Sequence, residues 1–239
     1  MSITYNCGCV NDFDRGVMKS IMKCDHHKAM QREIGELGEE YYQELGSATG
    51  IPPHVAEFED CFGNVEPVNP DRPFALEIGA GASHYVPMIT GAGWFYCACE
   101  PSRWARKWIL ERYGDRQIQL SNAPWEEYGR ADCILGDRGC HGGDWWQYGM
   151  ILSAHSLEHM TDAPLALAKM AEYLAPGGVL YLIVPHGGDD PVNPDHYWFF
   201  DPPGLEESMQ RAGLIVESMQ VRRRVEHERF IYCKARKPV

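Results

Sequence analysis

Short apolar runs alternate with segments of helical pattern along residues 73–239. Five runs are continuously apolar, as strands buried on both faces of a parallel sheet are. They lie at residues 74–78, 94–99, 131–137, 149–155 and 179–184. Helical segments are expected between them, and two further strands, at residues 214–221 and 230–235, complete the series. The alternation predicts an α/β domain with a Rossmann-like, seven-stranded, mostly parallel sheet and helices on both faces.

An acidic residue lies near the end of each of the first two apolar runs. Glu77 is the next-to-last residue of the first run. A turn of small residues follows at residues 79–81, where the backbone can approach a ligand closely. Glu100 follows the second run, and its separation from Gly81 is close to the spacing of about 20 residues at which Rossmann-like folds place a ribose-binding acid. The chain continues through Ser83 without the third glycine of the dinucleotide motif. These strand ends predict a site for a nucleotide-type ligand.

Cysteine and histidine residues gather in the segment 1–27, which is too short and polar to build its own core. Four of them have the chemistry of a closed, structural zinc site: Cys7, Cys9, Cys24 and His27. His26 competes with His27 as the fourth ligand. An amphipathic helix and a proline-rich connector then fill residues 28–72. We therefore expect a small, zinc-stabilised and helical extension before the main domain.

Composition narrows the partners of the chain. A net charge of −12 disfavours a nucleic-acid partner, because phosphate backbones bind basic surfaces. No apolar span of 18 residues and no secretory signal appear, so we expect a cytoplasmic protein without a membrane partner. The sequence makes no prediction about the oligomeric state.

Five segments occur in the order and spacing of a known family. They are Glu77-Ile78-Gly79-Ala80-Gly81-Ala82-Ser83, Glu100-Pro101-Ser102, Ser156-Leu157-Glu158-His159-Met160, Leu174-Ala175-Pro176-Gly177-Gly178, and the block from His196 to Pro202 followed by Ala212-Gly213-Leu214. Over residues 74–238 the chain resembles the class I S-adenosylmethionine-dependent methyltransferases that act on small molecules. The resemblance implies S-adenosylmethionine as the cofactor. It places the following residues at the cofactor: Glu77, Gly79, Ala80, Gly81, Glu100, Pro101, Asp137, Arg138 and His155.

The third strand has two candidates. The run 131–137 ends in Asp137, whereas an earlier stretch at residues 117–122 ends in Asn122 and is followed by Ala123. The family places the residue after this strand against adenine. We favour Asp137, because a carboxylate suits the exocyclic amine and the spacing to the next strand is preserved.

Three histidines are candidates for the base that removes a proton from the methyl acceptor: His155, His186 and His196. The family resemblance suggests a structural role for the neighbouring pair Glu158 and His159. The acidic balance favours a small acceptor such as a sugar, a nucleotide-sugar or another hydroxylated metabolite. Two rival functions are a methyltransferase-like binding module without catalysis and a nicotinamide-dependent oxidoreductase. The second predicts a third glycine after the turn, which this sequence lacks.

Overall fold

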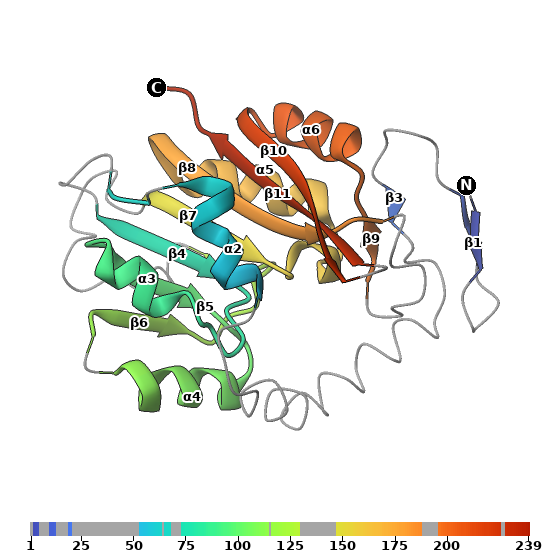
Figure 1. Ribbon diagram of the computed structural model, residues 1–239. Helices are drawn as coiled ribbons and strands as arrows, with labels where there is room; N and C mark the ends of the chain where they lie inside the picture. The colour runs from blue at the N-terminus through green and yellow to red at the C-terminus, as the bar shows by residue number, and fades with distance from the viewer. Residues whose placement is uncertain are drawn as a thin grey trace.

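The computed structural model describes residues 2–4, 10–12, 19–20, 53–63, 65–67, 73–114, 116–129, 147–187, 196–225 and 228–239. Its centre is a sheet of seven strands in the order β10-β11-β8-β7-β4-β5-β6 (Figure 1). The strands are β4 (Phe74–Ile78), β5 (Phe95–Cys99), β6 (Ile118–Ser121), β7 (Tyr148–Ala154), β8 (Leu174–Pro185), β10 (Ile215–Val225) and β11 (Glu228–Arg236). Strands β4, β5, β6, β7 and β8 pair in parallel with their neighbours, and β11 pairs antiparallel with both β8 and β10. The predicted fold class is confirmed.

Helices cover both faces of this sheet, as buried parallel strands require. They are α2 (Pro53–Phe62), α3 (Val86–Gly91), α4 (Arg103–Tyr113), α5 (Ala163–Tyr173), α6 (Pro202–Arg211) and the 3-10 turn η1 (Leu157–His159). One apolar core contains residues of α2, α3 and α4, among them Phe58, Ile89 and Ile109. The other contains Leu167 of α5 and Leu205 of α6. The connector before residue 73 therefore contains a helix, α2, whose Phe58 packs into the first of these cores.

Polar side chains define where three helices begin. Ser102 accepts a hydrogen bond from the backbone N–H of Ala105 at the start of α4, directly after β5. Asp162 and Asp201 accept equivalent bonds at the starts of α5 and α6. Such caps satisfy backbone donors that have no partner within the helix. Because the strands from β4 to β8 are parallel, their carboxyl ends lie at one edge of the sheet, where the predicted site residues lie.

The prediction for the third strand is wrong. Strand β6 pairs in parallel with β5, with Tyr96 opposite Ile118, and so the earlier stretch forms the third strand. Strand β6 lies at the sheet edge, and three of its four side chains are only partly buried. An edge strand of this kind needs no continuous apolar run, which is why its pattern was weaker than that of residues 131–137. The latter residues lie outside the described part of the chain.

Three short strands belong to the N-terminal part. β1 (Ser2–Thr4) and β2 (Val10–Asp12) form an antiparallel pair. β3 (Lys19–Ser20) pairs with β9 (Trp198–Phe199), which lies in the segment after β8. The predicted zinc ligands Cys7, Cys9, Cys24 and His27 lie outside the described residues, as does the helix predicted after them. Within the described ranges, no helix has the length and apolar character needed to cross a membrane.

Candidate active site

The glycine turn after β4 has the backbone geometry that the sequence predicted. Gly79 and Gly81 have φ angles of 66° and 52°, in the left-handed region that favours glycine. A Cβ atom on Gly79 would lie 2.5 Å from Oγ of Ser156, the residue that precedes η1. The turn therefore needs glycine both for its φ angle and for its contact with the segment that follows β7.

Glu77 is buried beneath this turn and accepts two side-chain hydrogen bonds. Its Oε2 atom accepts from the Ser83 hydroxyl at 2.6 Å and from the Tyr96 hydroxyl at 2.5 Å. Burial raises the pKa of Glu77 to about 7, although both hydrogen bonds act to lower it. Ser83, which follows the glycine turn, thus stabilises the carboxylate. Tyr96 was not predicted as a site residue, because it lies within an apolar strand and no local pattern distinguishes it.

Glu100 links the ends of the first two strands. Its Oε2 accepts from the backbone N–H of Gly81 and its Oε1 from that of Ser102, both at 2.7 Å. Burial raises the pKa of Glu100, and the two backbone donors oppose that shift. Arg106 donates to the backbone carbonyls of Glu100 and Pro101. Each carboxylate oxygen can accept a second hydrogen bond, which is the capacity that a pair of ribose hydroxyls needs.

The end of β6 lies beside these residues. The Ser121 hydroxyl accepts from the backbone N–H of Ala123 at 3.1 Å, and the Asn122 side chain is exposed. Asp137 and Arg138 lie outside the described residues. The family places the residue after the third strand against adenine. Since β6 is the third strand, this rule now favours Asn122 and Ala123.

His155 follows β7 in an unusual backbone conformation. Its φ angle of 52° is the one positive value for a non-glycine residue in the described ranges. Such conformations are strained and are concentrated at functional sites. The backbone N–H of His155 donates to the Ile183 carbonyl of β8, and the ring packs edge-on against Phe230 at a centroid distance of 4.8 Å. The histidine is therefore held at the carboxyl edge of the sheet by two neighbouring strands.

Glu158 lies beneath the histidines and is 1% exposed. Its Oε1 atom is 3.7 Å from Nδ1 of His155 and 4.0 Å from Nε2 of His159. Both distances are longer than a hydrogen bond. Burial acts to raise the pKa of Glu158, but the neighbouring histidines, His196 among them, hold it below its ordinary value. The residue is thus an ionised carboxylate in a buried, histidine-rich site.

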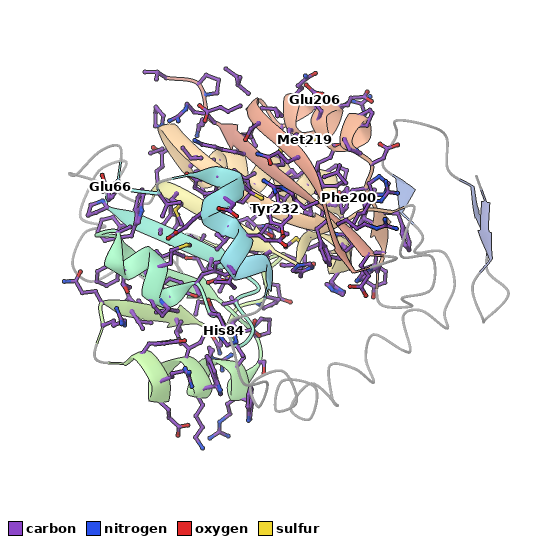
Figure 2. The ribbon with its side chains drawn as sticks, viewed as in Figure 1. Glu66, His84, Phe200, Glu206, Met219 and Tyr232 are labelled. Carbon is purple, nitrogen blue, oxygen red and sulfur yellow. The ribbon has the colours of Figure 1, made fainter. Side chains whose placement is uncertain are left out.

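Two of the three predicted catalytic histidines, His155 and His196, lie close to Glu158. His155 faces Glu158, and the ring of His196 meets that of His159 edge-to-face at 4.7 Å. His186 follows β8, where its backbone N–H donates to the Arg229 carbonyl and it forms an isolated bridge with Phe200. Phe200, the bridge partner of His186, lies near β9 in Figure 2, and His84 lies well apart from it beside α4.

Similar folds occur among solved structures. The 1,6-didemethyltoxoflavin-N1-methyltransferase of Burkholderia thailandensis, with 1,6-didemethyltoxoflavin and S-adenosylhomocysteine bound, is 18% identical over 91% of this chain and 92% of its own, with a TM-score of 0.64. The N-methyltransferase NodS of Bradyrhizobium japonicum WM9, in complex with S-adenosylhomocysteine, is 13% identical over 84% of this chain and 98% of its own, with a TM-score of 0.62. The [4+2]-cyclase SpnF has a TM-score of 0.59 at 11% identity, over 78% of this chain and 80% of its own. These identities establish the fold alone.

The family comparison goes further. No curated protein matches the chain. A family model described as a methyltransferase domain matches residues 57–219, more than half of the chain and all five parallel strands. The match includes the glycine turn, Glu77, Glu100 and the segment around Glu158. The chain therefore belongs to the methyltransferase domain family, and the prediction of an S-adenosylmethionine-dependent methyltransferase is confirmed.

Proposed function

We propose that this protein transfers the methyl group of S-adenosylmethionine to a small, hydroxylated metabolite such as a sugar or nucleotide-sugar. One observation carries the cofactor part of the proposal: a left-handed glycine turn lies between two buried carboxylates, Glu77 and Glu100, at the ends of adjacent parallel strands. The net charge of −12 supports a small acceptor over nucleic acid. The solved structures of similar fold include N-methyltransferases and a cyclase. The choice of acceptor therefore rests on the chemistry of this chain and not on those structures.

Each part of the cofactor has candidate partners. Glu100 would accept hydrogen bonds from the ribose hydroxyls, with the backbone of Pro101 beside it. The backbone of Gly79, Ala80 and Gly81 would approach the methionine part, with Glu77 beneath it. The position of β6 supports Asn122 and Ala123 at the adenine, where the side-chain oxygen of Asn122 would accept from the exocyclic amine. The argument for Asp137 and Arg138 no longer applies, because it took residues 131–137 as the third strand.

His155 is our candidate for the general base. Its Nδ1 atom faces the buried Glu158 carboxylate at 3.7 Å, and its backbone is held at the carboxyl edge of the sheet by the bond to Ile183. A proton taken from an acceptor hydroxyl would then reside on the imidazole while the oxygen attacks the methyl carbon and the carbon–sulfur bond breaks. His186 and His196 remain candidates on the same sheet edge. The structural zinc site of Cys7, Cys9, Cys24 and His27 also remains a proposal.

Calorimetric titration with S-adenosylhomocysteine tests the cofactor site. We expect the wild type to bind and Gly79→Ala to bind at least tenfold more weakly, because the new Cβ meets Ser156 and the left-handed φ disfavours alanine. Ser156→Gly removes the clashing side chain. The double variant should therefore recover part of the lost affinity, which a general loss of folding would not do.

Two results would contradict the proposal. Absence of S-adenosylhomocysteine binding by the folded wild type, with NADH bound instead, would indicate an oxidoreductase. Normal binding by Gly79→Ala would show that the turn has been misread. If the cofactor binds, a screen of candidate metabolites for methyl incorporation from labelled S-adenosylmethionine identifies the acceptor; binding without any incorporation would favour a binding module without catalysis.

A further inference from the structure

Three potential metal ligands gather at the end of η1. The ligand atoms of Glu158, His159 and His196 all lie within 4.8 Å of one another. Two hydrogen bonds hold the segment of His196 against η1: the Tyr197 backbone N–H donates to the Glu158 carbonyl at 2.8 Å, and Nε1 of Trp198 donates to the Met160 carbonyl at 2.9 Å. The cluster is therefore built by tertiary contacts between segments almost 40 residues apart.

The carboxylate in this cluster accepts no hydrogen bond, although two imidazoles lie near it. Neither side-chain oxygen of Glu158 has a hydrogen-bond partner among the described residues, although the residue is 1% exposed. Burying such a group without hydrogen bonds is costly, and buried charges are normally paired or coordinate metal ions. The two nearest imidazoles are at 3.7 and 4.0 Å, beyond hydrogen-bond distance. The free oxygens thus point to a ligand at this position.

We propose that Glu158, His159 and His196 bind a divalent transition-metal ion, with coordination positions left open for a substrate. Two imidazoles and one carboxylate suit Zn²⁺, Mn²⁺ or Fe²⁺, and three protein ligands are typical of sites that keep an open position. Ligand distances of about 2.1 Å require donor atoms about 3.4 Å apart in a tetrahedral site. The His159 side chain is 41% exposed, so its ring can rotate to close the remaining distance.

The site lies next to the cofactor loop. Ser156, two residues before Glu158, is the side chain that a Cβ atom on Gly79 would strike. If the proposed function is correct, an oxygen or nitrogen atom of the methyl acceptor would occupy an open position of the ion and be oriented toward the methyl donor. This role rests on the proposed function, whereas the metal site itself does not.

Cobalt titration of the full chain, freed of metal with a chelator, tests the metal site. Co²⁺ bound by imidazole and carboxylate gives visible d–d bands without the intense thiolate charge transfer that the cysteine-rich segment would give. We expect a variant with Cys7→Ser, Cys9→Ser and Cys24→Ser to retain a cobalt site free of thiolate bands. Adding His159→Ala and His196→Ala in that background should weaken this site at least tenfold, and Glu158→Gln should do the same.

His84→Ala is the matched control, since His84 (labelled in Figure 2) is also half-buried but packs against Trp108 of α4 and is not one of the three clustered ligands. Circular dichroism verifies that each variant is folded; should Glu158→Gln fail to fold, the partly exposed His159 provides the decisive single variant. Equal cobalt affinity in the wild-type cluster and the double-histidine variant would overturn the proposal, as would equal losses in the His84 control.

The two proposals fail separately. Loss of cobalt binding in the cluster variants, together with no binding of S-adenosylhomocysteine, would support the metal site and overturn the proposed function. Binding of S-adenosylhomocysteine with cobalt affinity unaffected by the cluster variants would support the function and overturn the metal site.

Discussion

Glu77 shows how a single side chain couples the cofactor turn to the sheet. Its carboxylate accepts hydrogen bonds from Ser83 in the turn and Tyr96 in the neighbouring strand, and it is 3% exposed. The ordinary pKa of 4.5 is raised to about 7 by burial. Between these values the folded protein holds a proton that the unfolded chain has lost. The free energy of unfolding must therefore fall as pH rises through this window.

Glu77→Gln tests this coupling. The amide cannot ionise, and its oxygen can still accept from Ser83 and Tyr96. We expect the wild type to lose up to about 3 kcal/mol of stability relative to the variant between about pH 4.5 and pH 8. Urea unfolding of both proteins across this range measures the difference, which removes the contributions that other carboxylates make to both. A difference independent of pH would show that Glu77 titrates at its ordinary pKa.

At the scale of elements, the position of β6 determines which residues we expect at the adenine part of the cofactor. It pairs in parallel with β5, so its last residue, Ser121, lies opposite Cys99 and directly beside Glu100. Asn122 and Ala123 follow it at the same sheet edge. A short edge strand with partly buried side chains is hard to identify by periodicity, because only one neighbour and part of one face constrain its residues.

Replacing Asn122 distinguishes the two candidates for the adenine contact. Asn122→Ala should weaken S-adenosylhomocysteine binding about three- to tenfold, the loss of one hydrogen bond, with little change in stability because the side chain is exposed. Asp137→Ala is the matched comparison and should bind as the wild type does. The reverse pattern in calorimetry would restore Asp137 as the adenine ligand.

At the scale of the molecule, α2 belongs with the sheet although it precedes the expected domain start at residue 73. Phe58 and Phe62 are buried against Tyr181 of β8, and the Tyr232 hydroxyl of β11 donates to Glu57 at 2.6 Å. The covering of one sheet face thus begins in the connector. The domain that folds as a unit should include residues from about 53 onward.

Truncation tests this boundary. Removing residues 1–50 should leave cooperative unfolding, because α2 and its contacts are retained. Removing residues 1–72 exposes the apolar face that Phe58 and Phe62 cover and should cost more than about 5 kcal/mol, estimated from the loss of two buried phenylalanines. Thermal unfolding and light scattering compare the two. Equal stability would place α2 outside the folding unit.

The sequence alone was sufficient for the parts that depend on local spacing. Continuous apolar runs marked β4, β5, β7 and β8, because strands buried on both faces tolerate few polar residues. The turn at residues 79–81 and Glu100 were identifiable since their chemistry lies within a few residues of a strand end. Composition and the order of motifs then indicated the family.

Only the tertiary structure could decide what long-range packing controls. The pairing of β5 with β6 replaced the favoured third strand, and no local pattern encodes that choice of neighbour. Ser156 against Gly79, Tyr96 on Glu77, and His196 beside Glu158 and His159 each join residues from separate elements. Side chains of this kind meet only after the chain has folded, so their contacts carry no signature in the sequence. The buried Glu158 carboxylate, which accepts no hydrogen bond and motivates the metal site, is one of them.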